Sequence, residues 1–143
     1  IHRGSLLPPV FIDPERIRLV LTNLLANAIT YTNAGGSIEV SAKYSKDTDY
    51  VLVSVRDSGM GIAQEDRPRI FSKFFRSGQA VRVQPNGSGF GLFIVKNIIL
   101  QHGGAIWFES EEGQGTTFFF TLPTKEEGVN KKEVSFEDLF LKI

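Results

Sequence analysis

The sequence predicts one globular domain that combines long helices with β-hairpins. Its 143 residues are 41% hydrophobic and 11% aromatic, which suits a single domain with its own core. Two stretches carry apolar residues at helical spacing, and four shorter stretches, grouped in two pairs, alternate apolar and polar residues. We place this domain at residues 10–123. Residues 1–9 are expected to be a lead-in from a preceding segment, and residues 124–143 a charged linker with a short amphipathic end.

A short strand and a long helix are expected at the start of the domain. Residues 10–12 are apolar and suit a strand. Asp13 can cap a helix that has Pro14 at its first position and Glu15 near the positive end of its dipole. Residues 33–36, with the sequence NAGG, are expected to end that helix. The residues expected to face the core are Ile17, Leu21, Leu24, Leu25 and Ala28.

Two pairs of alternating runs predict two hairpins. Apolar residues alternate over 38–44 and over 51–55, with a polar turn at 46–49. Residues 105–109 and 116–122 form the second pair, with a turn at 111–115. Between the hairpins, a second long helix is expected from Leu92 to about His102. The dipole at that helix end favours a charged His102, for which we expect a structural role.

The other segments carry weaker signals. Residues 63–71 suit a short helix, although Pro68 weakens it, and residues 77–91 are expected to be a loop. Near the end of the chain, Ser135 can cap an amphipathic stripe that could dock on its own domain, on other helices of the parent protein or on a receiver domain. The stripe consists of Phe136, Leu139, Phe140 and Ile143.

The composition excludes several classes of protein. Sixteen basic residues balance sixteen acidic ones, so no net charge attracts nucleic acid or a membrane surface. The absence of cysteine excludes disulfides, thiolate zinc sites and cysteine nucleophiles. No run approaches the ~18 apolar residues of a membrane span. We therefore expect no direct membrane insertion and a cytoplasmic location.

Asn23 and Asn27 lie four residues apart in the first predicted helix, and therefore on one face. Asparagine is a poor helix former, costing roughly 0.5 kcal/mol against alanine, so a pair on one face suggests a ligand. Their amide oxygens suit a Mg²⁺ that already carries phosphate charge. The alternative is two ordinary surface asparagines.

Asp57 ends an apolar strand and is followed by Gly59 and Gly61. A carboxylate only accepts hydrogen bonds, so it suits the exocyclic amino group of adenine and disfavours the oxygen that guanine carries there. The glycines would allow the backbone to approach a flat ring closely. The alternative is an ordinary turn after a strand.

Three spaced glycines, at 87, 89 and 91, open the second long helix. A glycine-rich turn at a helix N-terminus presents free amides to phosphates, although this one matches neither common phosphate-loop pattern. Residues 67–108 contain six basic residues and no acidic ones. Arg76 and Arg82 flank the loop and are the best candidates for phosphate contacts. The alternatives are a flexible linker and chance clustering of charge.

Taken in order, these segments resemble the catalytic, ATP-binding domain of sensor histidine kinases over residues 5–123. The five matching boxes are residues 23–32 (NLLANAITYT), 57–62 (DSGMGI), 70–76 (IFSKFFR), 87–92 (GSGFGL) and 113–118 (GQGTTF). The resemblance implies a two-layer α/β (α+β) sandwich, the Bergerat ATP-binding fold, in which helices cover one face of a mixed, mostly antiparallel sheet. It also implies ATP and Mg²⁺ as cofactors, with ATP under a mobile lid at about residues 72–90.

The resemblance assigns roles to residues by their position in the boxes. Asn27 would hold Mg²⁺ with help from Asn23, and Asp57 would read adenine. Phe71, Phe74 and Phe75 would anchor the lid. The other residues expected at the nucleotide are Tyr31, Gly59, Gly61, Ile62, Phe75, Arg76, Arg82, Gly87, Ser88, Gly89, Phe90, Gly91, Leu92 and Thr116.

The resemblance also implies partners, because the phosphate acceptor of the family is a histidine on separate dimerisation helices. No segment of this chain matches that acceptor motif, so we expect the chain to bind Mg-ATP without phosphorylating itself. A response-regulator receiver domain would be the second partner. The parent could be a membrane-bound sensor, with this domain on its cytoplasmic side.

Two departures from the family pattern concern activity. Thr30 stands where the family often has a lysine that meets the phosphates, and Phe90 and Phe93 are bulkier than the usual residues. One alternative function is therefore a scaffold that no longer binds nucleotide. The other is a hydrolytic ATPase of the same superfamily, but those enzymes place a glutamate where this chain has Asn23.

Overall fold

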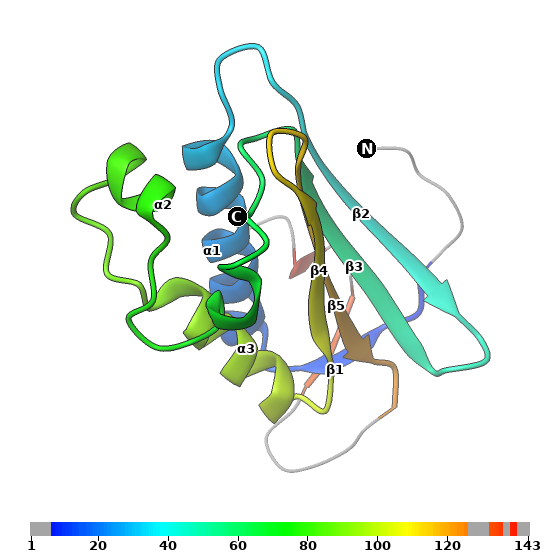
Figure 1. Ribbon diagram of the computed structural model, residues 1–143. Coiled ribbons are helices and arrows are strands. Elements are labelled where there is room, and N and C mark those ends of the chain that lie inside the picture. Colours follow the sequence, from blue (N-terminus) through cyan, green and yellow to red (C-terminus); the bar gives the residue numbers. More distant parts are fainter. Residues whose placement is uncertain (1–6, 126–131, 136–137, 140–143) are drawn as a thin grey trace.

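The structure is a computed structural model that describes residues 7–125, 132–135 and 138–139 (Figure 1). Its elements follow in the order β1 (Val10–Ile12), α1 (Pro14–Tyr31), β2 (Ile38–Ser45), β3 (Tyr50–Asp57), a 3-10 turn η1 (Arg67–Arg69), α2 (Gly78–Val83), α3 (Gly91–Gln101), β4 (Ile106–Glu111), β5 (Gly115–Pro123) and β6 (Lys132–Val134).

Two layers make up the domain. One layer is a four-stranded antiparallel sheet with the order β2–β3–β5–β4. The other layer is formed by α1 and α3, which pack against each other on one face of that sheet, while α2 lies on the side of α1 away from the sheet (Figure 1). The predicted sandwich is confirmed. None of the described helices is long and apolar enough to cross a membrane.

The core lies between the sheet and the two long helices. Val53 pairs with Phe120 and Val55 pairs with Phe118 across β3 and β5, so each pair presents its side chains to the same face. The predicted face of α1 is buried against them, except that Leu25 is only partly buried. The edge strand β2 is less covered, because the helices do not extend over it.

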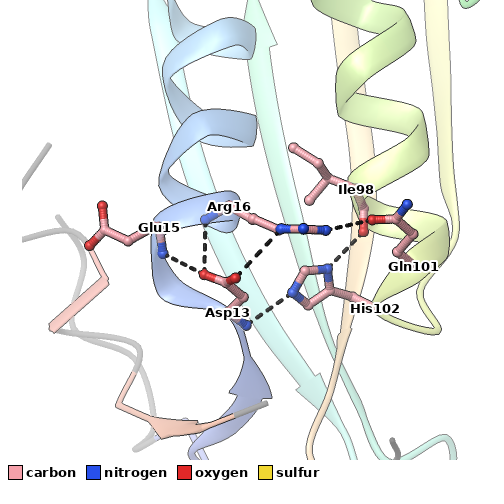
Figure 2. Close-up of polar contacts among 6 residues, drawn as sticks. All are labelled: Asp13, Glu15, Arg16, Ile98, Gln101 and His102. Carbon is pink, nitrogen blue, oxygen red and sulfur yellow. Dashed lines mark hydrogen bonds and ion pairs between the residues drawn. The ribbon is translucent and has the colours of Figure 1, made fainter. Parts of the chain in front are cut away.

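The beginning of α1 is joined to the end of α3 (Figure 2). Asp13 caps α1 as predicted, since its side chain accepts hydrogen bonds from the backbone of the first turn. His102 is buried and accepts a hydrogen bond at Nε2 from the Asp13 N–H over 3.0 Å, and its Nδ1 lies 2.7 Å from the Ile98 carbonyl oxygen. A lone pair on Nε2 requires a neutral ring with its proton on Nδ1. The expected charged form is therefore wrong, although the structural role is confirmed.

Two segments between the hairpins differ from the prediction. Residues 63–71 contain only the three-residue turn η1, because Pro68 removes a backbone donor. Residues 77–91, expected to be a loop, contain α2. Ser77 caps α2 by accepting a hydrogen bond from the Ala80 N–H over 3.0 Å.

The C-terminal segment packs onto the domain. Within the interval expected to be a charged linker, residues 132–134 form β6, which pairs antiparallel with β1. Ser135 accepts a hydrogen bond from the Asp138 N–H, so it caps the following turn as predicted. Leu139 is fully buried in the core, which confirms self-docking for this residue. Phe136, Phe140 and Ile143 lie outside the described residues.

Candidate functional site

A cavity of about 390 Å³ lies between α1, the start of α3, the lid and the end of the sheet at β3 and β5. Its size suits a small-molecule ligand. All but two of the residues predicted for the site line this cavity; the exceptions are Gly59 and Arg82. Eight further residues line it without having been predicted from the sequence: Ala26, Met60, Ile70, Ser77, Ala80, Gln84, Ile94 and Phe118.

Asp57 is the buried acid of the cavity. Its Oδ1 accepts hydrogen bonds from the N–H groups of Gly59, over 2.8 Å, and Thr116, over 3.3 Å. Burial raises the pKa of the Asp57 carboxyl, and these two hydrogen bonds act in the opposite direction. Because both bonds end on Oδ1, Oδ2 is the oxygen left to accept a hydrogen bond from a ligand.

Two glycines allow the loop after β3 to touch the β4–β5 turn. At Gly61, where φ is +69°, a Cβ atom would lie 2.1 Å from the Glu111 carbonyl oxygen. At Gly115, where φ is +104°, it would lie 2.1 Å from the Asp57 carbonyl oxygen. No side chain fits at either position. We call the lining residues Asp57, Gly61, Ile62 and Thr116 the sheet-end wall.

Gly59 has a different place from the one predicted. It is buried under the end of α1, where a Cβ atom would lie 2.3 Å from the Tyr31 carbonyl oxygen. The adjacent Met60 N–H donates to that same carbonyl oxygen over 3.1 Å. Gly59 therefore ties the loop to α1, while its neighbour Met60 lines the cavity.

The two asparagines of α1 both line the cavity, as their spacing predicts. The Asn23 side-chain N–H donates to the Leu19 carbonyl oxygen over 2.9 Å. Its other end approaches the start of α3, since a Cβ atom on Gly91 would lie 2.9 Å from Asn23 Oδ1. The amide oxygen of Asn23 thus lies near the glycine-rich N-terminus of α3.

The lid, residues 72–90, is held together mainly by contacts within itself. The Arg76 guanidinium donates to the carbonyl oxygens of Ala80, Gln84 and Pro85, at 3.1 Å for Ala80 and 3.0 Å for Pro85. Gly87 leaves room for this group, because a Cβ atom there would lie 2.7 Å from the guanidinium. The guanidinium donors of Arg76 are therefore engaged with backbone carbonyl groups of the lid.

Arg82 lies on α2 with an exposed side chain and does not line the cavity. This segment was predicted to be a loop, and a loop has no periodicity from which the direction of a side chain could be predicted.

The phenylalanines of the lid do not act as one anchor. Phe71, just before the lid, packs edge-on against Phe108 and Phe118, with ring centroids 6.0 and 6.2 Å apart. Phe75 lines the cavity. Phe74 is 64% exposed, has a φ of +64° and packs instead against Phe90, with centroids 4.5 Å apart. Phe71 and Phe75 both pack against the hydrophobic core, as predicted for anchors of the lid, whereas the exposed Phe74 does not.

The sequence and the fold are those of a known family. Residues 12–126 match the family model described as "Histidine kinase-, DNA gyrase B-, and HSP90-like ATPase". The chain belongs to this family, and the recognition of a histidine kinase ATP-binding catalytic domain is confirmed.

Two relatives of the chain are sensor kinases by name. The chain is 41% identical over 118 residues to sensor histidine kinase WalK of Bacillus subtilis (strain 168), covering 82% of this chain and 19% of WalK. It is 45% identical over 117 residues to adaptive-response sensory kinase SasA of Synechococcus sp. (strain JA-2-3B'a(2-13)), covering 82% of this chain and 30% of SasA. The chain thus spans less than a third of the length of these relatives.

Solved structures agree with the fold. The catalytic domain of histidine kinase ThkA superposes with a TM-score of 0.67 at 38% identity, covering 80% of this chain and 71% of that one. Full-length ShkA in complex with AMPPNP superposes with a TM-score of 0.70 at 34% identity, covering 92% of this chain and 25% of that one.

Proposed function

We propose that this chain binds Mg-ATP in the cavity and donates the γ-phosphoryl group to a histidine on separate dimerisation helices. The observation that carries the proposal is the placement of Asp57 and Asn27 on the walls of one cavity. A buried carboxylate with one oxygen available suits the exocyclic amino group of adenine, and such a charged hydrogen bond contributes ~1.5–3 kcal/mol. The AMPPNP bound to ShkA, a structural neighbour, supports the same ligand class.

The residues of α1 fit a metal ion that arrives with phosphate. The described part of the chain contains no group of three or more His, Cys, Asp or Glu residues that could hold a metal. The neutral amide oxygens of Asn27 and Asn23 suit Mg²⁺ whose remaining ligands come from phosphates and water. Bound there, Mg²⁺ would neutralise charge on the β- and γ-phosphates.

The start of α3 suits the phosphates of the nucleotide. Residues 87–91 line the cavity and lead into an eleven-residue helix, whose free amides and dipole favour an anion. For Arg76 to contact a phosphate, its guanidinium would have to give up hydrogen bonds to the lid carbonyls. We keep Arg82 as a candidate only for a lid that moves, because it lies outside the cavity here.

In the proposed reaction, a histidine nitrogen attacks the γ-phosphorus and ADP leaves with the electrons of the broken P–O bond. His102 is not suited to be the acceptor, because both ring nitrogens are engaged inside the fold. We therefore expect the acceptor on dimerisation helices elsewhere in the parent protein, and a receiver domain downstream. A cytoplasmic location, within a larger sensor, remains part of the proposal.

Calorimetry tests the binding step. We expect the wild-type chain to bind ADP more tightly with Mg²⁺ than without it. Asp57→Asn should weaken binding by at least about tenfold, because the amide cannot replace a charged acceptor. The control is Asp47→Asn in the exposed β2–β3 turn, which should bind as wild type does. An Asp57→Asn variant with wild-type affinity would contradict the proposed pocket.

Incubation with ATP and a purified dimerisation segment from a related sensor kinase tests the transfer step. We expect acid-labile phosphate on the added segment and none on this chain alone. Phosphate on His2 or His102 of the isolated chain would refute the claim that the acceptor lies elsewhere.

Two other functions predict different results. Thr30 lines the cavity where the family often has lysine, which favours a scaffold that has lost its nucleotide. The absence of ADP binding would support the scaffold function. A hydrolytic ATPase needs a base near the attacking water, and the Asn23 amide cannot accept that proton at neutral pH. Rapid phosphate release from ATP without an added segment would support the ATPase.

A further inference from the structure

Three polar side chains lie in a row across three strands at the end of the sheet. Asp57 on β3 pairs with Thr116 on β5, and Thr116 pairs with Ser110 on β4. Directly paired residues in antiparallel strands present their side chains to the same face. Asp57 and Thr116 line the cavity, and Ser110 lies behind Thr116 without lining it.

The Ser110 hydroxyl has three polar neighbours. The Ile62 N–H donates to it over 2.8 Å. The Gly115 carbonyl oxygen lies 3.0 Å away, and the Thr116 hydroxyl lies 2.9 Å away. Ser110 therefore links the loop after β3 with the β4–β5 turn, and its one proton must go to one of two oxygens.

Only one distribution of protons satisfies the Ser110 hydroxyl and its three neighbours, which are the Ile62 N–H, the Gly115 carbonyl oxygen and the Thr116 hydroxyl. The Gly115 carbonyl can only accept, and at 3.0 Å two oxygens need a proton between them. If Ser110 donates to Gly115, the second lone pair of Ser110 accepts the Thr116 proton. Thr116 then presents only lone pairs to the cavity. In the opposite arrangement, the oxygens of Ser110 and Gly115 would repel each other.

We propose that Ser110 is a positioning residue that fixes the Thr116 hydroxyl as an acceptor, and so sets which purines the cavity accepts. This inference rests on the proposed function. With the Thr116 hydroxyl and Asp57 Oδ2 both acting as acceptors, the sheet-end wall favours a 6-aminopurine, whose amino group supplies protons. It disfavours a 6-oxopurine, which presents an oxygen at the same position.

ADP and IDP are suitable probes, because their bases differ at two positions. At position 6, ADP carries an amino group and IDP carries an oxygen. At N1, IDP carries a proton and ADP does not. The test is to measure the affinity of the full chain for each nucleotide by calorimetry with Mg²⁺. The readout is the ratio of the two dissociation constants. A loss of local structure would weaken both nucleotides together, whereas a change in the acceptor wall changes the ratio.

We expect the wild-type chain to prefer ADP by at least about tenfold. Ser110→Ala frees the Thr116 proton to rotate into the cavity, and should reduce the preference by roughly three- to tenfold. It also removes the acceptor of the Ile62 N–H, so both affinities fall. Ser110→Thr keeps the hydroxyl and should keep the wild-type ratio.

A double-mutant cycle separates this inference from other effects. Thr116→Val removes the hydroxyl through which Ser110 is proposed to act, so Ser110→Ala should not change the ratio further in that background. If Ser110→Ala does not fold, Ser110→Cys, whose thiol is a weak donor and acceptor, takes its place and should reduce the ratio in the same direction.

Three results would overturn the inference while leaving ADP binding intact. The first is an unchanged ratio in the Ser110→Ala variant, and the second is an equal reduction of the ratio with and without Thr116→Val. The third is a wild-type chain that binds ADP and IDP equally well. A wild-type chain that binds neither nucleotide would instead refute the proposed function, and the inference with it.

Discussion

The sheet-end wall and the lid both line one cavity, but they are held in different ways. The wall depends on contacts between residues far apart in the sequence: Thr116 and Asp57, joined by a hydrogen bond, are separated by 59 positions. The lid depends mostly on near neighbours: every carbonyl bound by the Arg76 guanidinium lies within nine positions, although Gln79 also donates to the Glu112 carboxylate 33 positions away. It also exposes apolar side chains, including Val81 and Val83.

This difference indicates that the wall and the lid have separate roles in ligand binding. The wall is part of the packed sheet, so its acceptors can be in position before a ligand arrives. The lid adds little to the core and can rearrange at a lower cost, as expected of segments that close over ligands. We expect base recognition to depend on the wall and the fit around the phosphates to depend on the lid.

The largest effect is expected from a side chain forced into the wall. Gly61→Ala should lower the free energy of unfolding by about 3 kcal/mol or more, since its Cβ atom would overlap the Glu111 backbone. Gly113→Ala is the matched control: its φ of +81° is similar, but nothing lies within 4 Å of its Cβ position. That control should cost about 1 kcal/mol of backbone strain. Equal losses in urea denaturation would show that close approach in the wall is unimportant.

The C-terminal segment provides a second comparison with the lid, because it too lies outside the central sheet. Leu139→Ala should lower the free energy of unfolding by about 2–3 kcal/mol, since the side chain is fully buried. Leu100→Ala, at a residue that is 54% exposed on α3, should change it by less than about 0.5 kcal/mol. Similar values for the two variants would mean that Leu139 does not support the core.

A smaller effect on stability, confined to the lid, is expected from Arg76→Ala. Loss of the guanidinium should speed amide hydrogen exchange in α2 by about tenfold, equivalent to about 1.4 kcal/mol, without altering exchange in β3 or β5. Arg82→Ala on the same helix is the control and should leave exchange unchanged, because its exposed side chain has no hydrogen bond among the described residues. Faster exchange in β5 would contradict the separation of lid and wall.

The smallest effect is the pH dependence of the wall. Because burial raises the pKa of Asp57, the folded state holds this proton more tightly than the unfolded state does. The contribution of Asp57 to stability is therefore greatest below its usual pKa of 3.8 and falls as the pH rises through the raised value. Affinity for ADP should change the other way, because the proposed binding mode needs the Asp57 carboxylate.

Urea denaturation and calorimetry between about pH 4 and pH 6.5 test this prediction. The free energy of unfolding and the affinity for ADP should each be compared between wild type and Asp57→Asn, and the two differences should change in opposite directions with pH. The Arg76→Ala variant should keep the wild-type slopes, since the lid does not contact the Asp57 carboxylate through any described hydrogen bond. Parallel slopes for stability and affinity would contradict the assignment of Asp57 as the acceptor.

The sequence alone predicted the features that depend on local chemistry. Asp13 and Pro14 mark the start of α1, and apolar periodicity identified both long helices and both hairpins. The four-residue spacing of Asn23 and Asn27 was enough to place both on one side of a helix, and both line the cavity. These signals are short-range, so a single sequence contains them in full.

Only the tertiary structure could decide how distant segments meet. β6 pairs with β1 across 120 to 124 positions, and the polar, charged composition of that stretch does not predict a strand that forms a second sheet. The neutral form of His102 depends on the backbone N–H of Asp13, 89 positions away. Ser110 reads as an ordinary strand residue until folding places it behind Thr116. Helical periods and caps act within a few residues, whereas proton arrangement and close backbone contact depend on which strands become neighbours.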